Sequence, residues 1–204
     1  MVPRSSLRRL CDAVAFPTAF SAACFLAVLP QGYALPTGGQ VMAGDVSLTQ
    51  TGGAMTLMQA SRHAIMNWQS FNIGVGEQLQ ITQNGADAAM LARVIGSNPS
   101  QLLGALKADG KLFLINRNGI LVGAGATIDT AAFLASTLDV ADADFLKGAA
   151  LTLTGDSTAG VVNLGKSTAR EGNVLLLAHT VKNAGEICGA NGTGGLGAGT
   201  GAYL

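Results

Sequence analysis

The sequence predicts an all-β fold made of many short strands that are joined by tight turns. Glycine supplies 28 of the 204 residues, about twice the usual share, and charged residues make up 12%, about half of it. Short apolar runs alternate with small turn residues along most of the chain. A helical bundle needs more polar faces and a disordered chain needs more charge, so neither class fits.

The first strands are predicted from alternation of apolar and polar residues. Residues 46–50 and 55–58 alternate with a period of two, which is typical of half-buried strands. Residues 78–83 alternate most clearly, with leucine and isoleucine inward and glutamines outward. Two short helical turns are also expected, one in the apolar patch at residues 86–91 and one at residues 99–103, where Pro follows an N-capping Asn.

The central stretch, residues 110–137, contains three brief apolar segments separated by turns. Residues 112–115 resemble a buried strand, which the sequence Asn-Arg-Asn-Gly at 116–119 then ends. Asn and Gly tolerate positive φ, and Asn-Gly is a strong turn signal. Strands are expected to restart at residues 120–122 and again at residue 127. Such a segment suits a chain that stacks strands on itself.

Strand signals return about every ten residues in the last third of the chain. Asn163 and Asn183 fall near predicted strand ends, where an Asn can form a side-chain turn or stack on an Asn of the next coil. Residues 141–147 are acidic and fit a short helix or an exposed loop. The Gly-rich residues 190–204 are expected to form a loose tail, without a C-terminal cap, at the truncated start of further repeats.

This spacing of the predicted strands is compatible with two architectures. One is a solenoid with coils of about 20 to 25 residues, which would give about seven or eight coils. The other is an antiparallel sandwich, because short strands at this spacing suit it equally well. Periodicity alone leaves both open.

The N-terminus is predicted to be a secretory signal peptide, residues 1–34. Three arginines precede an apolar run at residues 13–29, and Gly32-Tyr33-Ala34 places small residues at the usual cleavage positions. The mature chain would then start at Leu35. A membrane anchor is the alternative, because a run of about 17 residues is at the lower limit of a bilayer span. A lipid anchor on Cys24 fits less well, because the apolar run continues past it.

Cleavage at this point would leave few reactive or charged groups. Cys188 would be the single remaining cysteine, so an intramolecular disulfide is impossible. Residues 1–34 hold three of the 12 basic and one of the 12 acidic residues, which leaves 9 and 11, a net charge of −2. A basic patch is absent from the sequence, and we expect no nucleic-acid partner.

Four segments of the chain form an ordered set of motifs: Trp68, Phe71, Ile73 and Gly74; Arg93, Gly96, Asn98, Pro99, Ser100 and Gly104; Asn116, Arg117, Asn118, Gly119 and Ile120; and Ala135, Ser136 and Thr137. In this order they resemble the two-partner secretion domain that opens filamentous haemagglutinins and related exported adhesins and haemolysins. The match covers residues 35–189. Arg117 stands where the family usually has Pro, and the second family signature, Asn-Pro-Asn-Leu, is absent.

The resemblance implies a right-handed parallel β-helix with short capping strands and loops. It also implies export from a Gram-negative bacterium, first by the general secretion machinery and then through a partner outer-membrane β-barrel transporter whose periplasmic domains recognise the chain. The protein would be secreted or held at the cell surface, where this domain would nucleate β-helix folding. Residues 116–120 would form the secretion motif.

Two other functions remain as alternatives. A free-standing adhesin would bind a glycan, matrix or host-cell receptor, but Trp68 and Phe71, the only clustered large aromatics, fit core packing better than a sugar platform. A β-helical polysaccharide-active enzyme would need paired carboxylates, or carboxylates with an Arg, on one outer face.

The residues that an enzyme or a metal site would use are sparse, and we expect no catalytic set, metal or cofactor. Cys188 is expected to be a small buried residue. The three aspartates at 139, 142 and 144 are expected to form a solvated loop. The remaining candidates, which are too isolated in the sequence to form a site, are Asp87, Asp109 and Asp129 for the enzyme, and His63 and His179 for a metal.

Overall fold

A computed structural model describes residues 34–148 and 150–204. Apart from Ala34, the predicted signal peptide lies outside the described residues. No helix in the described ranges is long and apolar enough to cross a bilayer.

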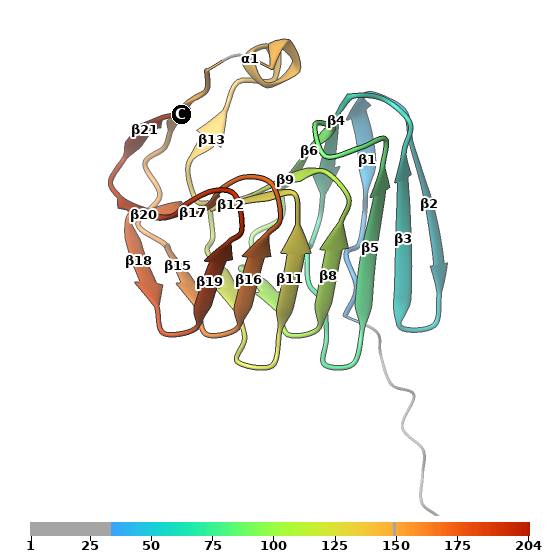
Figure 1. The fold of residues 1–204 in the computed structure, drawn as a ribbon, viewed down its shortest axis with the longest axis horizontal. Coiled ribbons are helices and arrows are strands. Elements are labelled where there is room, and N and C mark those ends of the chain that lie inside the picture. Colours follow the sequence, from blue (N-terminus) through green and yellow to red (C-terminus); the bar gives the residue numbers. More distant parts are fainter. Residues whose placement is uncertain (1–33, 149) are drawn as a thin grey trace, which may run out of the picture. The chain divides into compact units, whose positions relative to one another are not determined.

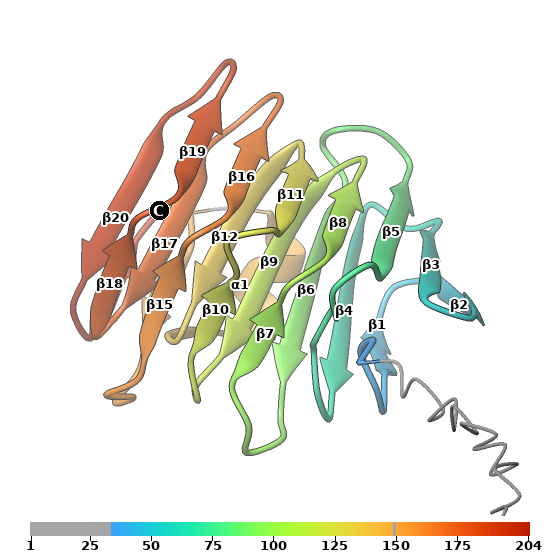
Figure 2. The ribbon, with the colours of Figure 1, turned by 90° about the horizontal axis from the view of Figure 1, so that it is seen from below.

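Three sheets are built from strands that recur in turn along the chain (Figures 1 and 2). Sheet A contains β1 (Gln40–Ala43), β4 (His63–Trp68), β6 (Ala89–Val94), β9 (Lys111–Asn116), β12 (Ala132–Ser136), β17 (Val174–Ala178) and β20 (Gly194–Ala198). Sheet B contains β2 (Val46–Thr51), β3 (Ala54–Gln59), β5 (Gln78–Gln83), β8 (Ala105–Ala108), β11 (Thr127–Thr130), β16 (Lys166–Ala169) and β19 (Glu186–Gly189). Sheet C contains β7 (Ser100–Leu102), β10 (Ile120–Val122), β15 (Gly160–Asn163) and β18 (Thr180–Asn183).

Each complete coil runs from sheet A through sheet C to sheet B and returns to sheet A one layer further on. Ala89, Lys111 and Ala132 pair in parallel register, so successive coils advance by 22 and 21 residues. Coil-to-coil pairing is parallel, which makes the fold a β-solenoid of about seven turns, as predicted. The alternative prediction of an antiparallel sandwich is wrong, because neighbouring coils in the described residues pair in parallel.

Inward-facing side chains of the three sheets form one continuous core. In-register stacking places like positions of successive strands above one another, so each layer buries the side chains of the next. One such row in sheet A consists of Met66, Ala92, Leu114, Ala135, Leu176 and Leu196.

The N-terminal end of the solenoid is covered by antiparallel strands. β1 pairs with β4, and β2 pairs with β3, so the first strands turn back over the first coil. Trp68 and Phe71 are buried beneath this region, with ring centroids 5.7 Å apart in an edge-to-face arrangement. Their predicted role in core packing is thereby confirmed.

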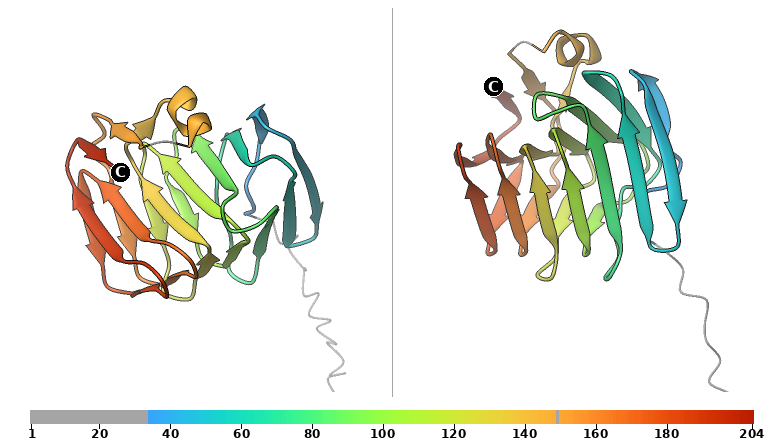
Figure 3. Two further views of the ribbon diagram at one scale, coloured as in Figure 1. Left: turned by 45° about the horizontal axis from the view of Figure 1, so that its top comes forward. Right: turned by 45° about the vertical axis from the view of Figure 1, so that its right-hand side comes forward.

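An insertion between β12 and β15 covers the outer face of sheet A (Figure 3). It consists of β13 (Asp139–Val140), helix α1 (Asp142–Lys147) and β14 (Thr152–Thr154), and β14 also pairs with the C-terminal strand β21 (Gly201–Tyr203). Phe145 and Leu153 pack there with Ile65, Leu91 and other outward-facing residues in a second apolar cluster. Both faces of sheet A are therefore apolar, which explains the unbroken apolar run at residues 112–115.

Three local predictions are wrong. Residues 86–91 and 99–103 do not form helical turns, because most of them belong to β6 and β7, whose pairing with neighbouring coils overrides the local helix signals. Residues 190–204 are not a loose tail: β20 continues sheet A, and β21 pairs with the insertion. The last coil is nevertheless open, since Leu196 is 55% exposed. The domain boundaries at residues 34 and 189 stay predictions.

Candidate functional site

The Asn-Arg-Asn-Gly turn lies at the corner where β9 of sheet A passes into β10 of sheet C. The N–H of Gly119 donates to the carbonyl of Asn116 at 3.1 Å, which closes the turn. Gly119 has a φ of 106°, in the region that favours glycine. The sequence signal for a turn was therefore correct at these residues.

Asn116 is completely buried, and its amide is fully used. Its Nδ2 donates to the carbonyl of Asn98 and to Oγ of Ser100, both at 3.0 Å. Its Oδ1 accepts from the backbone N of Asn118 at 2.9 Å and from the Nδ2 of Asn118 at 3.1 Å. Because a buried amide without partners costs about 1–3 kcal/mol, this side chain needs both the turn and the preceding coil in place.

Successive corners are stacked through similar contacts. Asn118 donates from Nδ2 to the carbonyl of Gly96 at 2.8 Å, so the turn rests on the corner of the coil before it. Gly96 in turn lies so close to the corner of the preceding coil that an added Cβ would sit 2.0 Å from the carbonyl oxygen of Gln69. Asn98 and Pro99 thus belong to a corner that supports residues 116–119, and Ser100 begins the strand beside Ile120.

Arg117 joins the turn to the coil that follows it. Its guanidinium lies 2.7 Å from Oδ1 of Asp156, and its carbonyl accepts from Oγ of Ser157. A groove of about 880 Å³ runs beside these corners, and its lining includes Arg93, Ile95, Arg117 and Asp156. Arg117 and Asn118 are exposed there, whereas Asn116 is not. The turn therefore presents its second and third residues on the surface.

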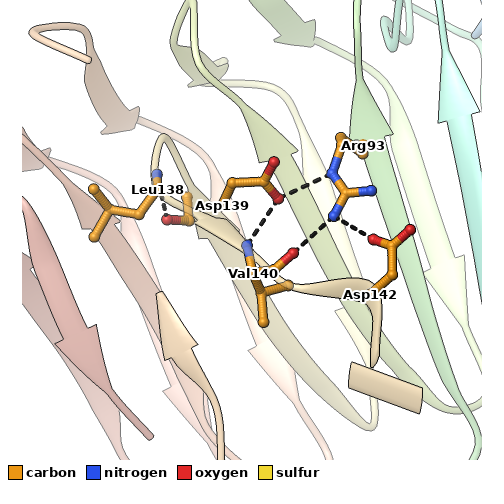
Figure 4. A network of polar contacts seen from close by, with 6 residues as sticks. Arg93, Leu138, Asp139, Val140 and Asp142 are labelled. Carbon is orange, nitrogen blue, oxygen red and sulfur yellow. Dashed lines mark hydrogen bonds and ion pairs between the residues drawn. The ribbon is translucent and has the colours of Figure 1, made fainter. Parts of the chain in front are cut away.

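Arg93 holds the insertion against sheet A beside the same groove (Figure 4). Its guanidinium lies 2.9 Å from Asp139 and 2.7 Å from Asp142, and it also donates to the carbonyl of Val140 at 2.8 Å. Burial disfavours its charged form, but Asp142 and Asp139 outweigh that effect and raise the pKa of Arg93. The three aspartate side chains are 40–49% exposed, as expected for solvated residues. The expected loop is wrong, because Asp139 lies in β13 and the other two lie in α1, and Asp139 and Asp142 bind Arg93.

The other residues that carry the family resemblance lie in the core or at places where the backbones of neighbouring coils pack together. Ile73 and Gly74 lie where sheet C begins, since Ile73 forms a parallel bridge with Leu102. Gly104 packs against the same place, because an added Cβ would lie 2.3 Å from the carbonyl oxygen of Glu77. The fourth segment ends β12: Ala135 is in the core, Thr137 is buried, and Ser136 Oγ accepts from the N–H of Leu138 where the chain leaves the coil.

The candidate enzyme residues are not brought together. Asp87 pairs with Lys111, Asp129 pairs with Arg170, and Asp109 accepts from the backbone N of Gln83. The cluster of Arg93 with two aspartates has the composition that the enzyme hypothesis required, but its donors are used to hold the insertion. Among the described residues there is no group of three or more His, Cys, Asp or Glu side chains that could hold a metal.

The histidines and the cysteine have separate environments. His63 contacts the carbonyl of Leu146 through Nδ1 at 3.0 Å, at the end of α1, and His179 is exposed. Cys188 is half-buried rather than buried as expected, since it lies on the terminal strand β19 of sheet B. Its thiol donates to Glu186, and that hydrogen bond raises the pKa of Cys188, which disfavours the reactive thiolate.

Sequence reasoning missed two features of this region. One is the partnership of Arg93 with the insertion, for which the acidic residues at 139 and 142 were a visible signal without an assigned partner. The other is Glu77, whose carboxylate is buried between two backbone N–H groups. Its position next to Gly76 in a short turn gave no indication of burial.

The stacked coils, the insertion held by Arg93 and the hydrogen-bonded asparagine turn define the chain as a β-solenoid domain. The family model described as "TPS secretion domain", where TPS stands for two-partner secretion, matches residues 32–203. The chain belongs to this family.

Two comparisons show how far the similarity extends. The crystal structure of the HMW1 secretion domain from Haemophilus influenzae aligns with a TM-score of 0.77 and 34% identity, over 82% of this chain and 46% of that one. Two curated relatives from H. influenzae, both named heme/hemopexin-binding protein, are 36% and 40% identical over 106 and 98 residues. These matches cover 52% and 48% of this chain but only 12% and 11% of the relatives' length.

Proposed function

We propose that this domain directs an exported protein through a partner outer-membrane transporter of a Gram-negative bacterium. The general secretion machinery would deliver the chain to the periplasm, and the transporter would release it to the cell surface or the medium. The observation that carries the proposal is the buried Asn116 turn, because it combines family membership with an exposed corner beside a groove.

Recognition would begin before the coils are complete. An extended chain offers unpaired backbone N–H and C=O groups, which suit strand addition to a periplasmic domain of the transporter. Residues 116–120 contain the polar side chains that later close the corner. Arg117 and Asn118, which remain exposed after folding, are the proposed contact residues of the motif.

The same domain would nucleate folding outside the cell. The antiparallel pairs β1–β4 and β2–β3 cover the first coil, so this coil can form without any preceding layer. Each later coil then adds parallel strands to an existing edge, as in other solenoids. Asn116 supports this order, because its Nδ2 bonds only to residues of the preceding corner.

Secretion in a Gram-negative host, with and without a cognate transporter, tests the proposal. We expect transporter-dependent release that is lost when Asn116 and Asn118 are both replaced by Ala. The matched control is Asn163→Ala, because Asn163 is equally buried and also bonds across coils, to Asn183 at 2.8 Å, at a different corner.

The outcomes separate recognition from folding. If Asn163→Ala reduces release as much as the double variant at equal loss of stability, the turn acts only through folding. Unchanged release of the double variant would remove the motif from the proposal. Retention in the periplasm despite the transporter would contradict the export function itself.

No observation favours the other functions. The clustered aromatics are buried. The three candidate carboxylates have separate partners: Asp87 pairs with Lys111, Asp129 pairs with Arg170, and Asp109 accepts from the backbone N of Gln83. The binding activity in the names of the curated relatives belongs to proteins of which this chain matches only 12% and 11% of the length.

A further inference from the structure

Glu77 is a buried carboxylate with no ion pair in the described part of the chain. It is 8% exposed and closes a turn in which its own N–H donates to the carbonyl of Gly74 at 3.1 Å. Its Oε2 accepts from the N–H of Gly74 at 2.6 Å, and its Oε1 accepts from the N–H of Ala34 at 2.8 Å. Buried acidic groups are usually paired with a cation.

The turn is shaped around this carboxylate. A Cβ added to Gly74 would lie 2.9 Å from Oε2 of Glu77 and 3.4 Å from Cβ of Ala34. Gly104 of the next coil packs against the carbonyls of Gly74 and Glu77. The carboxylate therefore faces the backbone of residue 34.

The chain that follows Ala34 is also fixed. Leu35 is 2% exposed and belongs to the main core, and Pro36 restricts its backbone to extended conformations. Thr37 forms an antiparallel bridge with Ser70, and the N–H of Thr37 donates to the carbonyl of Ser70 at 2.9 Å. The backbone nitrogen of Leu35 thus has a defined position at the edge of the core.

This place coincides with the predicted signal cleavage site, Gly32-Tyr33-Ala34. Hydrolysis of the amide between Ala34 and Leu35 would add the hydroxyl of water to the carbonyl carbon of Ala34 and a proton to the nitrogen of Leu35. That amine gains a further proton near neutral pH. Cleavage removes the N–H that Oε1 of Glu77 accepts and creates a cation one residue further along.

We propose that Glu77 is the binding site for the α-ammonium group of the mature chain at Leu35. Consecutive residues are about 3.8 Å apart, so a carboxylate that touches the nitrogen of Ala34 can reach the nitrogen of Leu35 by a small side-chain rotation. The ion pair would neutralise both buried charges. Removal of the signal peptide would thereby complete the first coil, which links processing to folding.

The test begins with the N-terminus of the chain after removal of the signal peptide, measured by mass spectrometry of the intact protein. We expect it to be Leu35. The pKa of its α-amine, followed by NMR in the folded protein, should lie about one unit above the ordinary value of about 7.7–8.0. By linkage, the ion pair then favours the folded state about ten-fold below that ordinary value, and the benefit is lost as pH rises through the folded pKa.

Selective acetylation of the α-amine provides the second measurement. We expect acetylation to reduce the folding equilibrium constant of the wild-type chain about ten-fold, measured by denaturant unfolding, and to have little further effect in Glu77→Gln. Glu171→Gln is the matched control, because Glu171 is exposed, and it should respond to acetylation as the wild type does.

Three results would overturn the proposal: a mature chain that does not begin at Leu35, an α-amine with its ordinary pKa, or an equal effect of acetylation in wild type and Glu77→Gln. If Glu77→Gln does not fold, the first measurement still decides, since it needs no substitution. None of these measurements involves the transporter, so their failure is distinct from failure of the export function.

Discussion

The central coils and the last coil share one register but differ in how well they are sealed. Leu114 of β9 and Leu196 of β20 occupy the same inward-facing row of sheet A. Leu114 is 0% exposed and Leu196 is 55% exposed. Leu114 has a strand on each side, whereas β20 is the terminal strand of its sheet. Burial in this fold is therefore supplied by neighbouring coils.

The outer faces of the two regions differ in the same way. Leu175 and Leu177 of β17 face the insertion, but Gly195 and Gly197 stand at the paired positions of β20. A Cβ at either glycine would lie 2.7 Å from Cδ2 of the leucine beside it. The leucines of β17 thus occupy the space over the last strand, which contributes backbone hydrogen bonds and little apolar surface.

Truncation of the same row in the two regions tests this comparison most strongly. Leu114→Ala should destabilise the domain by about 2–5 kcal/mol, because it leaves a cavity in a closed core. Leu196→Ala should cost about 0.5 kcal/mol or less, as expected for an exposed position. Denaturant unfolding of both variants measures the difference. Similar losses would show that the last coil is packed as tightly as the centre.

Substitutions at two glycines test whether close contact between neighbouring coils causes the tight packing of the central coils. Gly96→Ala should cost about 1–3 kcal/mol, because the methyl group would meet the backbone carbonyl of Gln69 and force the corners apart. Gly125→Ala is the control: an added Cβ there meets nothing within 4 Å, and its φ is not in the left-handed region. Its stability should change by no more than about 0.5 kcal/mol. An equal response at both corners would exclude contact as the explanation.

Local sequence signals predicted the turns and the alternating strands, and they failed where another coil decides the conformation. The Asn116–Gly119 turn was predictable because its conformation depends on its own residues. β7 was not, since Asn-Pro is a good helix start, and residues 100–102 are extended because they pair with β10 on one side and with Ile73 on the other.

The candidate functional site shows the same difference between features that local residues determine and features that distant residues determine. Asn163 and Asn183 were each expected either to form a side-chain turn or to stack on an Asn of the next coil. The hydrogen bond between their side chains agrees with the second alternative. The partners of Arg93 lie 46 and 49 residues further along the chain, on the insertion, so no local pattern could assign them. The solenoid architecture was predictable only through the family resemblance, because periodicity fitted a sandwich equally well.

The smallest effect is expected at Arg117, where this chain departs from the family. Arg117 is the second residue of a turn closed by Asn116 and Gly119, a position that favours Pro. Arg117→Pro would lose an exposed ion pair with Asp156, worth about 0–1 kcal/mol, and would reduce the freedom of the unfolded chain by a similar amount. The free energy of unfolding should therefore change by about 0.5 kcal/mol or less.

Asn118→Pro is the matched control for this substitution. It would remove both donors to Oδ1 of Asn116, the backbone N–H at 2.9 Å and the Nδ2 at 3.1 Å, and so take away both partners of that buried oxygen. We expect it to destabilise the domain by about 1–3 kcal/mol. A large loss in Arg117→Pro, measured by the same denaturant unfolding, would mean that the contact between Arg117 and the following coil stabilises the corner. In that case the cross-coil ion pair, and not the turn alone, would replace the proline of the family motif.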